Sequence, residues 1–272
     1  MKFKKIRKVF RIFFPKKFSS TELFEHQLHH NREIVSFIKE HDSYLVKLKN
    51  TLTIKMRNEN HSDYMVLQQV FNLKQYEIIT SLIKSNQKTN DKNVIIDAGA
   101  NVAYTSLYFS NSLSRVSVYA VEPSFENAAM CNENISLNML DNKIHFYHRA
   151  LSHKSGLKFQ LNTKFRDAKD WAIMTKQDVN GKVEGITIGE IISENNLSYI
   201  TLIKIDIEGA ERFIFDNDSD LSFLKITKLI AIEIHDEFNI REKIYVILKE
   251  YGYYLFETGE LTVGVNKNLL AK

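Results

Sequence analysis

Cysteine is nearly absent from this 272-residue chain, which contains only Cys131. A single cysteine excludes an intrachain disulfide. Cys131 lies within a helical pattern, where we expect it to be a small buried apolar side chain. No apolar run reaches the ~20 residues needed to span a bilayer, which excludes a transmembrane helix.

Glycine is also scarce, and its spacing excludes one large class of binding sites. Dinucleotide-binding folds require G-x-G-x-x-G at the first turn from strand to helix. The corresponding turn here, Ala98-Gly99-Ala100-Asn101, contains one glycine. This turn therefore favours a ligand without a pyrophosphate.

Acidic residues are missing from the amino terminus. Residues 1–17 contain eight basic residues and no acid, whereas the net charge of the whole chain is +4. The rest of the chain is therefore net acidic, at about −4. No basic stripe with interleaved aromatic residues continues beyond the arm, so we expect no nucleic acid as a partner.

Residues 1–18 form a basic, amphipathic arm. Phe3, Ile6, Phe10 and Phe13 recur at helical spacing until Pro15 ends the pattern. Such a segment suits the surface of an anionic membrane, but a helix packed on its own domain or a disordered tail are alternatives. It lacks the 7–15-residue apolar core of a secretory signal. We expect a cytoplasmic protein, with peripheral contact at the inner face of the membrane as a hypothesis.

The stretch from Val94 to Phe109 is the organising part of the sequence. Val94-Ile95-Ile96 is a β-branched run typical of a parallel strand buried on both faces. A small-residue turn and a helical pattern follow, which together predict the first unit of a doubly wound α/β sheet. Gly99 would let the backbone approach a ligand closely. Asp97, at the strand end, suits a cationic or amine-bearing ligand.

Glu122 follows the next predicted strand, Val116–Val121. An acid about 20 residues past the glycine turn is placed to accept hydrogen bonds from both hydroxyls of a ribose. The alternative for a single Glu is a solvated surface charge. Its position after a β run, followed by Ser124 as a helix cap, favours the ribose.

Several blocks together resemble the FkbM-type S-adenosylmethionine-dependent methyltransferases. They are Asp97-x-Gly99-Ala100-Asn101, Glu122-Pro123, Lys204-Ile205-Asp206-Ile207-Glu208-Gly209-Ala210-Glu211 and Glu233-Ile234-His235. The resemblance runs from about Leu52 to Gly264. It implies a Rossmann-like class I methyltransferase fold, in which helices cover both faces of a mostly parallel seven-stranded sheet whose last strand is antiparallel. Where the family usually has a second glycine, this chain has Ala103, so we expect a tighter turn or helix start there.

The order of the predicted elements divides the chain into three parts. The basic arm (1–18) precedes a helical and hairpin cover (19–92), and the methyltransferase domain occupies residues 93–272. Within the cover we expect a helix over residues 21–39, a hairpin of 44–48 with 52–56, and a broken helix from Asp63 to Ile83 capped by Ser62. Tyr76 is interpreted as a core residue, with contact to the cofactor as the alternative.

The resemblance also implies which residues bind the cofactor, S-adenosylmethionine. The predicted set is Asp97, Gly99, Ala100, Asn101, Tyr104, Thr105, Glu122, Pro123, Ala150, Leu151 and Asp206. Ala150 and Leu151 follow the strand 144–148, whose tip we expect beside the adenine.

The acceptor is assigned to less regular parts of the chain. Residues 162–185 show no clear period, and a long irregular insertion is usually a lid or binding loop. It contains Asp170 and the single tryptophan, Trp171, which we predict to contact substrate. Glu208 and Glu211, beyond the strand that ends in Asp206, are the other predicted substrate residues.

Methyl transfer to a hydroxyl needs a group that removes the hydroxyl proton. Asp206 and His235 follow neighbouring predicted strands and are the candidate bases. Lys204 shares a strand face with Asp206 and would fix its orientation, although a purely structural ion pair is an alternative. Asp206, Glu208 and His235 also form a candidate divalent site suited to magnesium. We rank it second and assign no metal ligand.

The preferred interpretation is an O-methyltransferase. The resemblance implies a hydroxyl acceptor on a sugar, polysaccharide, glycolipid or natural product, so the expected partner is a small molecule or glycan. The competing interpretation is a methyltransferase-fold scaffold that has lost catalysis and binds a partner. Ala103 favours the scaffold, whereas intact Asp97, Glu122, Asp206 and His235 oppose it. The oligomeric state is not legible in the sequence.

Overall fold

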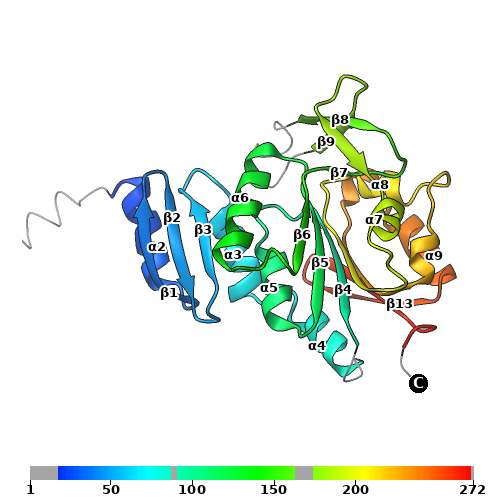
Figure 1. The fold of residues 1–272 in the computed structure, drawn as a ribbon, viewed down its shortest axis with the longest axis horizontal. Helices are drawn as coiled ribbons and strands as arrows, with labels where there is room; N and C mark the ends of the chain where they lie inside the picture. The colour runs from blue at the N-terminus through cyan, green and yellow to red at the C-terminus, as the bar shows by residue number, and fades with distance from the viewer. Residues whose placement is uncertain (1–17, 87–90, 163–173, 271–272) are drawn as a thin grey trace, which may run out of the picture.

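A seven-stranded sheet forms the centre of the computed structural model, which describes residues 18–86, 91–162 and 174–270 (Figure 1). Its strand order is β13-β14-β12-β11-β4-β5-β6. The strands are β4 (Asn93–Ala98), β5 (Val116–Val121), β6 (Ile144–Tyr147), β11 (Ile200–Ile205), β12 (Thr227–Glu233), β13 (Tyr253–Thr258) and β14 (Leu261–Asn266). β4, β5, β6, β11 and β12 pair in parallel, whereas β14 is antiparallel to both β12 and β13. The predicted sheet with an antiparallel last strand is confirmed.

Helices cover both faces of this sheet. On one side lie α4 (Glu77–Ser85), α5 (Tyr104–Ser112) and α6 (Phe125–Leu137), and on the other α7 (Ile188–Glu194), α8 (Glu211–Ile214) and α9 (Arg241–Glu250) (Figure 1). Short 3₁₀ turns η2 (Ser222–Lys225) and η3 (Asp236–Phe238) flank β12. The predicted cap Ser124 is confirmed, because its side chain accepts from the amide of Asn127. At the start of α7, Thr187 forms a capping box with Glu190.

Alternation along the strands distributes side chains between two cores. Ile95 and Leu202 face the core with α5 and α6, whereas Ile96 and Ile203 face the core with α7 and α9. From β4 the strand order runs to one side through β5 and β6, and the later strand β11 lies on the other side of β4, so the order reverses between β4 and β11. In a doubly wound sheet this switch point opens a crevice at the carboxyl ends of the strands.

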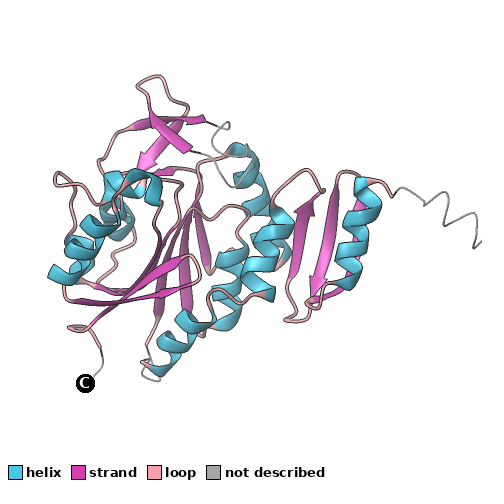
Figure 2. Ribbon diagram, turned by 180° about the vertical axis from the view of Figure 1, so that it is seen from behind, coloured by secondary structure: helices cyan, strands magenta, loops and turns pink. Residues whose placement is uncertain are grey.

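A three-stranded antiparallel sheet forms the amino-terminal cover, in the order β1 (Ile34–Glu40), β2 (Ser43–Leu48) and β3 (Thr53–Arg57). Seen from behind, α5 and α6 lie between it and the main sheet (Figure 2). The predicted hairpin is confirmed, but the predicted helix over 21–39 is wrong. Helix α2 (Ser20–His30) ends early because the side chain of Asn31 accepts the amide of Glu33, 2.9 Å away, and the chain turns into β1.

The predicted broken helix is confirmed as three pieces: α3 (Asp63–Leu67), a π-helical turn η1 (Gln68–Asn72) and α4. Ser62 stands at the start of α3 but makes no capping hydrogen bond, contrary to expectation. Asp63 is instead engaged by Arg57, whose amide and guanidinium both donate to its carboxylate. This segment of the cover connects β3 to β4 of the main sheet.

The supposedly irregular insertion contains regular structure. A small four-stranded sheet has the order β7-β10-β8-β9, from Ala150–Leu151, Val183–Ile186, Lys158–Asn162 and Met174–Gln177. The prediction of an aperiodic stretch over 162–185 is therefore wrong for its described part. The strands are too short for a period of two to be legible in the sequence. No helix among the described residues is long and apolar enough to cross a membrane.

Candidate active site

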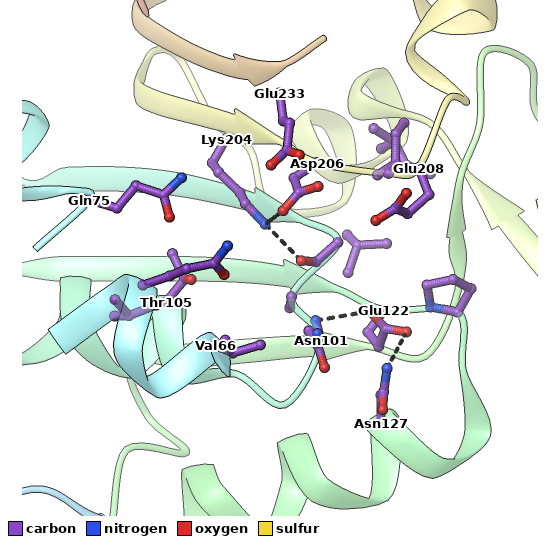
Figure 3. A pocket seen from close by; sticks show the side chains of 18 of the residues that line it. Val66, Gln75, Asn101, Thr105, Glu122, Asn127, Lys204, Asp206, Glu208 and Glu233 are labelled. Carbon is purple, nitrogen blue, oxygen red and sulfur yellow. Dashed lines mark hydrogen bonds and ion pairs between the residues drawn. The ribbon is translucent and has the colours of Figure 1, made fainter. Parts of the chain in front are cut away.

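A cavity of about 440 Å³ opens where the crevice at the strand ends was expected. Its walls come from the turn after β4, the ends of β5, β11 and β12, and the cover segment α3–η1–α4 (Figure 3). The lining residues are Val66, Gln69, Val70, Gln75, Tyr76, Gly99, Ala100, Asn101, Thr105, Val121, Glu122, Pro123, Asn127, Leu151, Thr175, Lys204, Asp206, Ile207, Glu208, Glu233 and Glu260. This volume lies within the ~300–1,000 Å³ typical of small-molecule sites.

The turn after β4 is built from residues in left-handed conformations. Gly99 has φ +78°, and a Cβ there would lie 1.7 Å from the carbonyl oxygen of Asp206. Glycine is thus required by the contact between the β4 and β11 tips, rather than by close approach of a ligand as the sequence suggested. Ala103 also has φ 67°, a conformation that costs a residue with a Cβ roughly 1–2 kcal/mol. The alanine therefore holds this turn under strain.

Glu122 lies at the cavity wall and is 5% exposed. Its carboxylate accepts the amides of Asn101 and Ser124, both at 2.9 Å, and lies 3.5 Å from the side-chain amide of Asn127 (Figure 3). Burial raises the pKa of Glu122 to about 7, although these hydrogen bonds act in the opposite direction. The alternative of a solvated surface charge is excluded.

Asp97 does not line the cavity, and its side chain is completely buried. It accepts the hydroxyl of Ser106 at 2.6 Å and lies 3.3 Å from Nζ of Lys204. The sequence predicted direct contact with a ligand, but the odd-numbered side chains of β4 point into the core beneath α5. Any influence of Asp97 on a ligand would pass through Lys204.

Lys204 connects the two strand tips. Its ammonium donates to the carbonyl of Gly99 at 2.7 Å and lies 3.4 Å from the carboxylate of Asp206 (Figure 3). Burial opposes its charge, but Asp206 and Asp97 outweigh burial and raise the pKa of the ammonium. The predicted shared face of Lys204 and Asp206 is confirmed, and the charged lysine fixes both the glycine turn and the Asp206 carboxylate.

His235 is buried behind the cavity wall, between two acids. Its Nδ1 lies 2.8 Å from Glu211, and its Nε2 lies 3.3 Å from Glu208. Burial alone would lower the pKa of His235, but these two carboxylates outweigh it and raise the pKa to about 10. These carboxylates favour the protonated form of the ring, which is a poor proton acceptor, so the surroundings of His235 do not favour the predicted role as general base.

Other predicted residues fall into three groups. Gly99, Ala100, Asn101, Thr105, Glu122, Pro123, Leu151, Lys204, Asp206 and Glu208 line the cavity together. Tyr104, Ala150 and Glu211 are buried and do not line the cavity. Tyr104 donates to the carbonyl of Lys55, and Glu211 accepts a hydrogen bond from His235. Asp170, Trp171 and the basic arm lie outside the described residues.

The sequence missed an acidic pair and the contribution of the cover. Glu233 and Glu260 both line the cavity, and burial together with the nearby carboxylate of Asp206 raises the pKa of Glu233 to about 8. Glu233 belongs to the block Glu233-Ile234-His235, so its place beside His235 at a strand end could have identified it as a site residue. Tyr76 is a buried core residue, as interpreted from the sequence, and it also lines the cavity. Gln69 and Gln75 carried no legible signal.

The strand order, the crevice at the switch point and the buried acid after β5 define a Rossmann-like class I methyltransferase. The family model described as "Methyltransferase FkbM domain" matches residues 97–255. The chain therefore belongs to the FkbM family of S-adenosylmethionine-dependent methyltransferases.

Solved structures with a similar fold are distant in sequence. A putative caffeoyl-CoA O-methyltransferase from Staphylococcus aureus is 12% identical, with 76% of this chain and 93% of that chain covered at a TM-score of 0.44. A putative O-methyltransferase from Klebsiella pneumoniae is 11% identical, covering 96% and 94% at 0.44. The N-terminal domain of human METTL16 in complex with SAH is 11% identical, covering 78% and 84% at 0.46. These values are too low to inform the substrate, and no curated protein matches significantly.

Proposed function

We propose that this chain transfers a methyl group from S-adenosylmethionine to a hydroxyl oxygen of a small-molecule or glycan acceptor. The observation that carries the proposal is the division of one cavity into two ends. Glu122 lies on one side of the cavity, and Asp206, Glu208 and Glu233 lie on the other (Figure 3). Glu260 is a further acid in the cavity lining. Clustered acids suit a polyhydroxyl acceptor, because hydroxyl groups donate hydrogen bonds to them and must lose a proton on methylation.

The residues at the Glu122 end fit the cofactor. Glu122 offers a buried carboxylate to the ribose hydroxyls, and Val121, Pro123 and Leu151 offer apolar surface to the adenine. The side-chain oxygen of Asn101 is buried without a hydrogen-bond partner, as expected where a ligand completes the site. When bound, the cofactor supplies an activated methyl group.

The proton acceptor at the other end must reach the cavity. Asp206 and Glu233 both do, from the tips of the adjacent strands β11 and β12. Asp206 is held by Lys204, which also donates to the Gly99 carbonyl in the cofactor turn. Lys204 is thus proposed as a positioning residue that sets the acceptor end against the cofactor end.

Two variants separate the ends of the cavity. Asp206→Ala should lower turnover by roughly 10²-fold or more while S-adenosylhomocysteine binds with nearly native affinity. Glu122→Gln should chiefly weaken that binding. Calorimetry gives the affinities, and S-adenosylhomocysteine formation with a panel of polyhydroxyl acceptors gives turnover. If Asp206→Ala lost cofactor affinity as well, Asp206 would belong to the cofactor end.

The scaffold alternative makes the opposite prediction for the native chain. Its supporting feature, Ala103, is strained but does not close the cavity. A ligand that binds only the native state raises the melting temperature. S-adenosylhomocysteine should therefore raise the melting temperature of the native chain, and no shift at high ligand concentration would favour the scaffold.

A further inference from the structure

The starting observation is a buried His–Glu pair beside the cavity. His235 is 3% exposed, and Glu211, its partner at 2.8 Å, has no exposed surface. The carboxylate of Glu211 accepts hydrogen bonds, so Nδ1 of His235 carries the hydrogen that joins them. The arrangement fixes the orientation of the ring and directs Nε2 away from Glu211. Histidines that bind metals are commonly held through their second nitrogen in this way.

The second observation concerns Nε2 itself. It is a buried nitrogen that makes no hydrogen bond of proper geometry in the described structure. It points toward the carboxylates of Glu208 and Asp206, and ligand atoms of the three residues lie within 4.8 Å of one another. Ligands of an octahedral ion at about 2.1 Å are about 3.0 Å apart when adjacent and about 4.2 Å apart when opposite. The 3.3 Å between Nε2 and the Glu208 carboxylate is close to the adjacent spacing, and Asp206 would complete the set by a side-chain adjustment.

We propose that Asp206, Glu208 and His235 bind a divalent cation, with Glu211 as the residue that orients His235. Two carboxylates balance the charge of the ion. Oxygen ligands with one imidazole suit Mn²⁺ better than Mg²⁺, which prefers an all-oxygen shell. The ion and a proton compete for Nε2, because only a neutral imidazole is a ligand.

The remaining coordination positions of this ion would face the cavity. Asp206 and Glu208 line it (Figure 3), whereas His235 is buried and does not belong to the lining. An acceptor oxygen bound there would have a lower pKa, and its deprotonation would need a weaker base. This consequence rests on the proposed methyl transfer. The cation site itself does not.

The test is a titration of the full chain, freed of metals with a chelator, with Mn²⁺ at pH 8. Electron paramagnetic resonance of free Mn²⁺ and calorimetry report the binding. We expect one site per chain, weakened at least tenfold in Asp206→Asn, Glu208→Gln and His235→Gln. Glu211→Gln should weaken it about 10–100-fold, the usual effect of losing a partner of a ligating histidine. Glu260→Gln removes a cavity acid outside the set and should change affinity much less.

Circular dichroism and melting temperature establish that each variant is folded. The Asp206→Asn variant is the safest, because the Asp206 side chain is 30% exposed. The inference is overturned if the folded native chain binds no Mn²⁺ below millimolar concentration, or if binding is the same in Asp206→Asn and in the Glu260 control. S-adenosylhomocysteine binding is measured separately, so failure of the cation site leaves the proposed function standing.

Discussion

At the scale of single residues, the direction of a side chain decides its role more than its place in a motif. Asp97 and Glu122 both end buried parallel strands, and both were expected to hold the cofactor. The side chain of Asp97 lies under α5 against Lys204, whereas Glu122 lies at the cavity wall. Glu122 is therefore the acid on which cofactor affinity should depend.

Glu122 should also make cofactor binding depend on pH. Its pKa is raised to about 7 by burial, with Lys204 acting to lower it. A ribose is bound best by the ionised carboxylate, so binding below that pKa must expel a proton. We expect S-adenosylhomocysteine affinity to rise with pH through about 7, by up to about tenfold per unit below it. Calorimetry from pH 5.5 to 8.5 measures this.

The Glu122→Gln variant is the control for that profile. Its amide cannot ionise, so its weaker affinity should be flat over the same pH range. A native affinity that does not change with pH would show that the ionised carboxylate is not what binds the ribose.

Residue type and spacing predicted that acids lie at the strand ends, but not which side chains contact one another there. The Glu-x-His block was visible, yet Glu233 was missed and His235 was expected to act as a base. Two acids from the β11–α8 turn surround His235, and only the folded turn brings Glu208 and Glu211 to its two nitrogens. The pKa of a histidine follows from such neighbours, which sequence separation does not reveal.

At the scale of elements, the cover is attached to the methyltransferase fold by side chains that replace a missing strand. The backbone of β3 has no strand beyond it in the order β1-β2-β3. Asn134 on α6 and Asn138, which caps the end of that helix, bond this backbone instead. Asn134 accepts the amide of Lys55 at 2.7 Å and donates to the carbonyl of Val102 at 2.9 Å. Asn138 accepts the amide of Thr53 at 2.9 Å and donates to the carbonyl of the same residue at 2.7 Å.

Removing one of these asparagines should destabilise the whole chain. Asn134→Ala leaves the Lys55 amide and the Val102 carbonyl without this partner, and we expect a loss of about 2 kcal/mol in the free energy of unfolding. Urea unfolding followed by circular dichroism measures it. Asn132→Ala, on the exposed side of the same helix, should change stability by less than about 0.5 kcal/mol. Equal effects of the two variants would refute the attachment through α6.

Elements with a strong period were predicted well, and those set by local side-chain bonds were not. The largely apolar, β-branched segments that form β4, β5, β11 and β12 are typical of buried strands. Residues 21–39 also have a helical period, but the Asn31 turn interrupts it. The small sheet beside the cavity depends on pairings between distant short strands, such as Val183 with Phe159. No local pattern encodes such a pairing.

At the scale of the whole molecule, the cover and the sheet share one core. Apolar residues of the cover, such as Ile54 and Leu67, belong to the same buried cluster as Ile95 and Leu107. Gln69, Gln75 and Tyr76 consequently form part of the cavity wall. The sequence identified the half of the site that the family motifs mark. It could not identify the half supplied by the cover, because that half depends on packing between distant segments.

Positive charge is concentrated in the basic arm, whereas the rest of the chain is net negative, and this asymmetry leads to a prediction for the arm. The eight basic residues at 1–17 precede a body that is net acidic. An anionic membrane would attract the arm, at roughly 1 kcal/mol per basic residue near its surface, and repel the body. A variant lacking residues 1–17 should therefore bind anionic vesicles at least tenfold more weakly than the full chain. Co-sedimentation measures the partition.

Neutral vesicles and added salt separate attraction by charge from burial of the arm's aromatic residues. Binding of the full chain should fall on neutral vesicles and at high salt, because both remove the electrostatic part. Equal partition of the full chain and the shortened variant to anionic vesicles would exclude membrane docking by the arm. The cavity would then have no reason to favour a lipid-linked acceptor over a soluble glycan. If the arm does bind, it would hold an acidic cavity close to a surface that its own charge would otherwise avoid, which favours an acceptor carried by the membrane.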